Sequence, residues 1–428
     1  MGLVNGMRKW WPSLLAVVLI LVAALTGCSQ SADNGKIKLR VVTMFGGTDP
    51  AKKAYEQALK DFMKAHPDVE IVDESMTATG DDFRTKVKTD FASGNEPDVT
   101  FFFTGAEAEP IIQSGAVVPY EEIFAEDKAW SDAFSDNVKQ QVKAKDSKIY
   151  AVPITGFYEG LFVNKSLFKK YGLELPTNWE KFTKAVETFS KNGIIPIAGS
   201  LEESYYLIEH FILSAGGPAG HNSKFDNGIH PSWAQGLEKI KEVYEMGGFP
   251  KDALTIKDAQ AQELFKNKQA AMIVNGSWIL GGLTDKEDVE VIPFPVMPGG
   301  KANPQDLVAG YTSGFYLSKK SYEDKDKKGL ALELIKYLTS KEMVKKFAEA
   351  NGGVPAVDTK VEGLPTVYQQ GHQMVQEANS LSLPIDAQIS AEAFNEIRKG
   401  IPHIVQGKKT AQEVLQAAQK IEQEKMPK

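Results

Sequence analysis

Strand-like and helix-like patterns alternate in the first part of the chain after residue 36. Every second residue from Ile37 to Thr43 is apolar or β-branched, which predicts a strand with one buried face. Residues 69–72 and 99–103 are predicted to form two further strands. The segments between them place apolar residues on one helical face: Tyr55, Ala58, Leu59, Phe62 and Met63 in the first, and Phe83, Val87 and Phe91 in the second. This alternation implies an α/β protein with parallel strands and helices on both faces of the sheet.

The same two patterns continue to the C-terminus with a larger share of helix. A capping-box run at residues 177–180 begins one helix, and Gly216-Gly217-Pro218 is expected to end another that covers residues 205–215. Neither a repeat nor a long linker interrupts the pattern, so two lobes joined by short crossovers are expected. Further strands are predicted at 161–163, 194–198 and 271–274, and further helices at 330–338, 343–350 and from 411 onward.

The first 27 residues have the pattern of a secretory signal. Arg8 and Lys9 precede an almost wholly apolar run, and the run ends in Leu25-Thr26-Gly27-Cys28. That ending resembles a bacterial lipobox, in which Cys28 would be diacylated and become the mature N-terminus. A transmembrane helix is the alternative, but Pro12 shortens the run below the roughly 20 apolar residues that a membrane span needs. The sequence therefore predicts a lipoprotein signal peptide over 1–27, a flexible tether over 28–36, and attachment to the extracytoplasmic face of the cell membrane.

Composition narrows the class of protein. The chain has 428 residues, enough for roughly two or three domains. Its formal net charge is -7, and an acidic body argues against nucleic-acid binding. Cys28 is the single cysteine, so the sequence offers no internal disulfide, no cysteine nucleophile and no thiolate metal site. We expect neither a metal nor a cofactor.

Motifs of hydrolytic enzymes are missing from the sequence. It contains neither His-Glu-x-x-His nor Gly-x-Ser-x-Gly, and Gly310-Tyr311-Thr312-Ser313-Gly314 places its serine one position late. A glycosidase needs only two carboxylates, and 56 acidic residues could hide such a pair. A secreted carbohydrate-active hydrolase therefore remains an alternative to a protein that binds without catalysis.

Several short motifs, in order, resemble the family 1 extracellular solute-binding proteins, the group that includes maltose-binding protein. Each motif alone is weak, but their joint order together with a lipobox is specific, and the resemblance runs from about Ile37 to the C-terminus. Val163 stands where the family usually has Tyr, and Asn267 or Lys268 where Gly is common. The motifs are the runs at 92–99, 149–153 with 161–165, 176–180, 265–278 and 352–355.

The resemblance implies a two-lobe periplasmic-binding-protein fold of the type II-like kind. Each lobe would be a mixed sheet flanked by helices, with the ligand cleft between the lobes. Lobe one would hold residues 37–153 plus 308–357, and lobe two residues 157–303 plus 361–428. The family also implies a monomer that delivers its ligand to two membrane permease subunits, which a separate ATPase serves.

Ligands of open α/β sheets bind beyond the carboxyl ends of the strands, and this rule selects three segments. Phe102 and Phe103 are neighbours on a predicted strand, so one ring should face the core and the other should face outward. We select Phe102 as the cleft residue and favour Phe103 less. The chosen candidates are Phe45 and Thr48 after the first strand, Phe102 and Thr104 after the third, and Phe157 and Tyr158 at the crossover beside Glu159.

The family resemblance adds candidates from other parts of the chain. Asp82 lies at a helix start, Tyr206 and Phe394 lie on helices where a stacking aromatic is expected, and Trp278 matches a stacking tryptophan. Tyr311 adjoins the second crossover. Each has an ordinary alternative, because helical aromatics are usually core residues and Asp82 could be a helix cap.

Aromatic rings with neutral or acidic neighbours are typical of a site for a sugar. A sugar has apolar C–H faces and a rim of hydroxyl groups, which flat rings and polar side chains can bind. A phosphate or carboxylate ligand would require Arg or Lys in the cleft segments, and neither Arg84 nor Lys165 is convincingly placed there. The sequence thus predicts a non-enzymatic binding component of an ABC importer for a small carbohydrate. A binder of another solute class is the second alternative.

Overall fold

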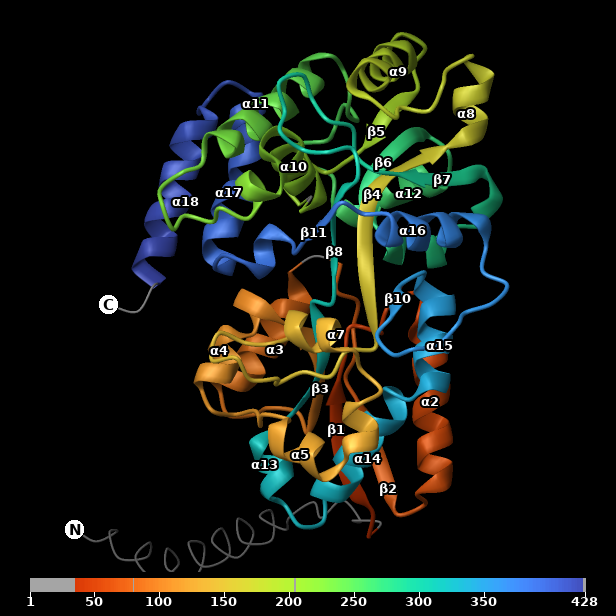
Figure 1. The fold of residues 1–428 in the computed structure, drawn as a ribbon, viewed down its shortest axis with the longest axis vertical. Helices are drawn as coiled ribbons and strands as arrows, with labels where there is room; N and C mark the ends of the chain where they lie inside the picture. Colours follow the sequence, from red (N-terminus) through yellow and green to blue (C-terminus); the bar gives the residue numbers. More distant parts are fainter. Residues whose placement is uncertain (1–34, 80, 204, 426–428) are drawn as a thin grey trace, which may run out of the picture.

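The computed structural model describes residues 35–79, 81–203 and 205–425 of the chain. The predicted signal peptide and Cys28 lie outside these residues, so their interpretation stays a prediction. Figure 1 shows the described chain as two halves stacked along the long axis, with strand β4 running between them. None of the helices in the described residues combines the length and the apolar character that crossing a membrane requires.

The half in which the described chain begins, called the first lobe below, is built on a four-stranded sheet. Its strand order is β2-β1-β3-β9, with β1 parallel to β2 and β3, and β9 antiparallel to β3. Alternate residues of β1, Leu39 and Val41, are fully buried, as the period-two pattern predicts. The strands are β1 (Ile37–Val42), β2 (Val69–Asp73), β3 (Val99–Phe103) and β9 (Ser313–Leu317).

Helices pack on both faces of this sheet. Tyr55 of α2, Leu334 of α14 and Phe347 of α15 share one hydrophobic cluster, and Phe83 of α3 belongs to a second cluster. The helices of this lobe are α2 (Lys52–Ala65), α3 (Asp82–Ala92), η1 (Gly105–Glu107), α4 (Glu109–Gln113), α5 (Glu121–Glu126), α6 (Lys128–Ser131), α7 (Asp136–Gln141), α13 (Lys319–Glu323), α14 (Lys328–Leu338) and α15 (Lys341–Asn351).

The other half, the second lobe, is built on a seven-stranded mixed sheet around β4. The main strand order is β11-β8-β4-β6-β5, and β7 and β10 pair with other parts of β4. Near its start β4 pairs with β10, and further along it pairs with β8, β6 and β7. The strands are β4 (Thr155–Asn164), β5 (Ile195–Ala198), β6 (Ala270–Gly276), β7 (Val289–Ile292), β8 (Asp306–Gly310), β10 (Val354–Pro355) and β11 (Ser380–Ser382).

Helices surround this second sheet and bury the largest hydrophobic cluster of the described chain. Trp233 of α11, Phe211 of α10 and Ile397 of α17 are all buried in it. The helices are α8 (Lys165–Lys170), α9 (Trp179–Lys191), α10 (Tyr206–His221), α11 (Pro231–Glu245), α12 (Asp258–Lys266), η2 (Ser277–Gly282), η3 (Lys286–Asp288), α16 (Thr366–Gln376), η4 (Ile385–Ala387), α17 (Ala391–Val405) and α18 (Ala411–Lys425).

The predicted fold class is confirmed: the protein is α/β, with two mixed sheets flanked by helices. One predicted bound differs from the structure. Residues 308–310 were expected in lobe one, but they belong to β8, which pairs with β4 and β11 in the second lobe. The predicted helix break at Gly216-Gly217-Pro218 is present within α10, because Gly217 adopts non-helical angles (φ 60°, ψ -172°) and a second short helical segment follows it.

Within the described residues the chain passes between the lobes at three places. It enters β4, leaves the second lobe between β8 and β9, and returns at β10. The other predicted lobe boundaries stay a prediction.

Candidate ligand-binding cleft

A cavity of about 230 Å³ lies between the two lobes. The segments after the carboxyl ends of β1 and β3 line it from the first lobe, which is where open α/β sheets bind ligands. From the second lobe it is lined by the first half of β4, the start of α10 and η2. We call this cavity the cleft.

Three aromatic side chains from the second lobe form one side of the cleft, called here the aromatic wall: Phe157, Tyr206 and Trp278. The Trp278 ring centroid lies 5.7 Å from that of Phe157 and 5.2 Å from that of Tyr206. All three side chains line the cavity and are partly exposed. The structure therefore brings together three predicted candidates that are distant in sequence.

The position of the Trp278 ring depends on Gly276. A β-carbon on residue 276 would lie 2.0 Å from the Trp278 Cη2 atom, a separation that no real pair of atoms adopts. Glycine at the end of β6 thus leaves the room that the indole needs to pack close to the backbone.

The first-lobe side of the cleft contains three further predicted residues. Phe45, Thr48 and Thr104 all line the cavity. Phe45 is only 5% exposed, because its ring packs against Phe101 at 4.7 Å and Phe347 at 4.8 Å between ring centroids. Its contribution to the cleft is therefore an edge rather than an open face.

The choice of Phe102 over Phe103 is wrong. Phe102 is fully buried under α3, with its ring centroid 5.7 Å from that of Phe83. Neighbouring strand residues point to opposite faces, so Phe103 is the ring that lines the cleft.

Tyr158 and Phe394 are core residues, which corrects two more predictions. Successive side chains of β4 point to opposite faces, and Phe157 and Glu159 face the cleft. Tyr158, which lies between them, therefore faces the core of the second lobe and is fully buried. Phe394 is 1% exposed, and its ring stacks on Tyr205 at 5.1 Å between centroids. Phe394 thus supports Tyr205, which does line the cleft.

Asp82 and Tyr311 also lie outside the cavity lining. Asp82 is an exposed residue in the first turn of α3. Tyr311 donates a hydrogen bond of 2.9 Å from its hydroxyl to the Pro355 carbonyl, so it braces two of the crossovers. Its neighbour Thr312 lines the cleft instead.

Asp81, next to the predicted Asp82, joins the two lobes. Its carboxylate accepts hydrogen bonds from Arg398 at 2.8 Å and from the Tyr205 hydroxyl at 3.1 Å, both from the second lobe. The Arg398 pair lowers the pKa of Asp81, although partial burial opposes that shift. The side chain of Asp81 is half exposed, so solvent screens this contact.

Arg84 lines the cleft, contrary to the sequence-based view that it is not convincingly placed. Its Nε donates to Glu107 at 3.2 Å, and its guanidinium lies 3.7 Å from the Asp386 carboxylate. The guanidinium carbon lies 4.1 Å from the centroid of the Phe103 ring. Arg84 is thus already paired with two carboxylates and a ring, and it is not a free cation for an anionic ligand. Lys165 does not line the cavity.

A group of acidic side chains lies deep in the cleft, called here the acidic floor: Glu159, Glu209 and Asp386. Burial, followed by the neighbouring Glu209 carboxyl, raises the pKa of Glu159 well above its usual range. Burial and then Asp386 raise the pKa of Glu209 likewise, and burial raises that of Asp386 to about 6. These carboxyls therefore retain protons at a pH where exposed acids have lost them.

Two buried histidines beside the acidic floor are neutral. Burial lowers the pKa of His210 to about 3 and that of His221 to about 4. His210 donates from Nδ1 to the carbonyl of Tyr206 at 3.2 Å, which fixes its ring on α10. Neither histidine supplies a positive charge to the acidic floor near neutral pH.

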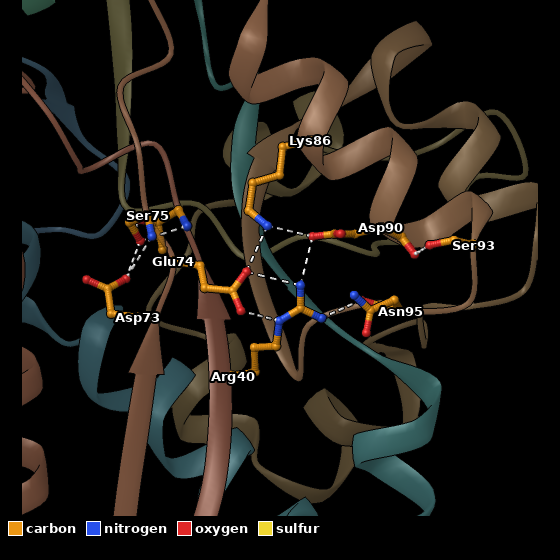
Figure 2. Close-up of polar contacts among 9 residues, drawn as sticks. Arg40, Asp73, Glu74, Ser75, Lys86, Asp90, Ser93 and Asn95 are labelled. Atoms are coloured by element: carbon orange, nitrogen blue, oxygen red, sulfur yellow. Dashed lines mark hydrogen bonds and ion pairs between the residues drawn. The ribbon is translucent and has the colours of Figure 1, made fainter.

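An ion cluster holds α3, the helix that carries Arg84, on the first-lobe sheet (Figure 2). Arg40 of β1 binds Glu74 at 2.6 Å and Asp90 of α3 at 3.0 Å, and Lys86 binds the same two carboxylates at 2.7 and 2.9 Å. The hydrogen bond from Arg40 is the largest cause that lowers the pKa of Glu74 to about 2. The cluster lies outside the cavity lining, so we assign it to positioning α3.

Sequence reasoning did not select Tyr205, Glu209 or Asp386 as site residues. One signal was present for Glu209, which is an acid inside the mostly apolar run of residues 207–215. Acids are rarely buried, and a buried carboxyl in a cleft is a candidate functional group. Asp386 carries no comparable signal, because its role depends on Arg84, which is distant in sequence.

Comparison with known proteins gives one matching family. The profile of the family described as bacterial extracellular solute-binding proteins matches residues 46–345, well over half of the chain.

Individual relatives are distant but cover most of the chain. The multiple sugar-binding protein of Streptococcus mutans is 24% identical over 364 residues, 82% of this chain and 83% of that protein. The melibiose/raffinose/stachyose-binding protein MelE of Bacillus subtilis is 25% identical over 312 residues, 69% of this chain and 70% of that protein. A solved chitin oligosaccharide binding protein superposes with a TM-score of 0.81 at 22% identity, covering 91% of this chain and 98% of that one.

Proposed function

Because this chain belongs to the bacterial extracellular solute-binding protein family, we propose that it is the substrate-binding component of an ABC importer. It captures a sugar or oligosaccharide between its lobes and delivers it to the membrane permease. Two permease subunits and a separate ATPase complete the importer, and the binding protein acts as a monomer without catalysis.

The aromatic wall is the observation that carries this proposal. Phe157, Tyr206 and Trp278 present ring surface to the cavity, and ring surface is what the C–H faces of a sugar contact. Thr48, Thr104 and carboxyl groups supply hydrogen-bonding partners around that surface for the hydroxyl rim. The names of the relatives, which bind multiple sugars, raffinose-type sugars or chitin oligosaccharides, support the same ligand class.

The charge of the cleft supports an uncharged ligand over an anionic one. Arg84 is paired with Glu107 and Asp386, so its charge is not available to a phosphate or a carboxylate. A binder of anionic solutes is therefore the weaker alternative.

A thermal-shift screen of residues 29–428 against a carbohydrate panel tests the proposed function. The panel should include raffinose, stachyose, melibiose and chitin oligosaccharides, together with amino acids, peptides and sugar phosphates. We expect at least one uncharged sugar to raise the unfolding temperature. A ligand at a hundred times its Kd raises the free energy of unfolding by about 2.7 kcal/mol. A response to non-carbohydrate solutes alone would contradict the proposal, and release of shorter sugars from a bound oligosaccharide would favour the hydrolase alternative.

We further propose that the lipid on Cys28 holds the protein at the outer face of the membrane. Cys28→Ser removes the only thiol that could be acylated, so we expect the variant to appear in the soluble extracytoplasmic fraction. Fractionation and immunoblotting of cells that express either form measure this. Retention of the serine variant with the membranes would show that another segment anchors it.

A further inference from the structure

Glu159 has an unusual position for an acidic residue. It lies on β4, is 1% exposed and lines the cleft, yet its Oε2 atom has no hydrogen-bond partner among the described residues. The nearest cationic candidate is His210, whose Nδ1 lies 3.5 Å from Oε2. That nitrogen donates its proton to the Tyr206 carbonyl, and the ring is neutral near physiological pH. Because buried polar atoms in folded proteins nearly always have partners, a missing partner at a cleft indicates a group supplied from outside.

The aromatic wall lies next to this carboxyl group. Phe157 precedes Glu159 by two residues on the same face of β4. Glu159 is paired in register with Gly276 of β6, the residue against which the Trp278 ring lies. A sugar ring on Trp278 would therefore present the hydroxyls of one edge to Glu159.

The groups around Glu159 favour its acid form. No cation faces it directly, because Arg84 of α3 is engaged by Glu107 and Asp386. Burial is the largest cause that raises its pKa, followed by the Glu209 carboxyl, through its charge and a hydrogen bond with Glu159, and then by the Asp386 carboxyl. The titratable groups that face it are Tyr206, Glu209 and His210 of α10 and Asp386 of η4.

We propose that Glu159 is a ligand-binding residue whose carboxyl group hydrogen-bonds to a hydroxyl of an uncharged sugar stacked on the aromatic wall. This inference rests on the proposed function. A carboxylic acid can donate from one oxygen and accept at the other, which matches the two-way hydrogen bonding of a sugar hydroxyl. The deprotonated form has only acceptors and would also repel Glu209 more strongly.

Calorimetric titration of the protein with raffinose, stachyose and chitotriose tests the proposal at several pH values. The wild-type affinity should be constant at mildly acidic pH and fall as the pH rises and Glu159 loses its proton. Glu159→Gln keeps both a donor and an acceptor, so its affinity should stay within about threefold of the wild type and lose this pH dependence. Glu159→Ala should bind about tenfold or more weakly, because it leaves the hydroxyl unpaired.

Glu238→Gln is the matched control, since it makes the same chemical change in α11, outside the cleft, where Glu238 accepts a hydrogen bond of 3.1 Å from the Ala411 N–H. It should leave the affinity and its pH profile unchanged. A wild-type protein that binds a sugar with no effect of either Glu159 variant would overturn the inference and leave the proposed function intact. Failure of the wild type to bind any uncharged sugar would overturn both.

Discussion

Replacing Trp278 by alanine should weaken sugar binding by roughly tenfold or more. The indole is the central ring of the aromatic wall, in contact with both Phe157 and Tyr206. One aromatic stack contributes about 0.5–1.5 kcal/mol beyond burial, and 1.4 kcal/mol corresponds to a tenfold change in Kd. Calorimetry with the sugar that the panel identifies measures the difference directly.

Trp179→Ala provides the matched control for this experiment. Trp179 packs against Phe182 and Phe211 in the second lobe and does not line the cleft. This variant should lower the unfolding temperature but keep the affinity of the wild type. Equal affinities of the Trp278 variant and the wild type would mean that the ring does not contact the ligand.

Gly276→Ala examines the same ring without deleting it. The added methyl group would overlap the indole, so Trp278 must leave its place against β6. We expect a loss of affinity that approaches that of Trp278→Ala, because the variant keeps the indole side chain but moves it away from the position in which it can stack on the ligand.

Gly371→Ala should destabilise the protein, although alanine is the better helix former. Gly371 lies inside α16, where alanine would ordinarily gain about 1 kcal/mol. Its β-carbon would however lie 1.9 Å from Cζ of the fully buried Tyr158 ring. Overpacking of a filled core costs about 1–3 kcal/mol and sometimes more, so we expect a net loss of about 2 kcal/mol in the free energy of unfolding. Denaturant titration of each variant measures it.

Two further variants separate steric overlap from helix propensity. Gly329→Ala changes another helical glycine, in α14, whose β-carbon would have no atom within 4 Å, and it should be neutral or slightly stabilising. Combining Gly371→Ala with Tyr158→Leu removes the ring that is overlapped, so the two changes should cost less together than the sum of each alone. Additive costs would show that the ring is not the cause.

The elements of the first lobe were largely predictable because their signals are local. β3 has the predicted bounds, and the helix that contains Phe62 follows from its single apolar face. The second-lobe sheet was harder, since β7 and β8 are short and fully or largely buried, and such strands lack an alternating pattern. Their place in the sheet depends on β4, which the pattern identified only in part.

The candidate site was predictable where the strand-end rule applied. Phe45, Thr48, Thr104 and Phe157 follow from that rule and line the cleft. Successive side chains of a strand point to opposite faces, so one of two neighbouring residues faces the cavity and the other faces the core. The prediction assigned Phe102 to the wrong face.

Contacts between distant segments left no trace in the sequence. Asp81 and Arg398 are 317 positions apart, and only the folded chain brings their charges together. The same holds for the partners of Arg84, whose pairing with Glu107 and Asp386 leaves its charge unavailable to a ligand.

The link between Asp81 and Arg398 affects how binding data on this protein should be interpreted. The two charges belong to different lobes and the Asp81 side chain is half exposed, so added electrolyte weakens their attraction. Ionic strength would then alter how firmly the two lobes are held together before any ligand is present. Even a sugar without charge would bind with an apparent salt dependence, a behaviour that is commonly taken as evidence that the ligand itself is an ion.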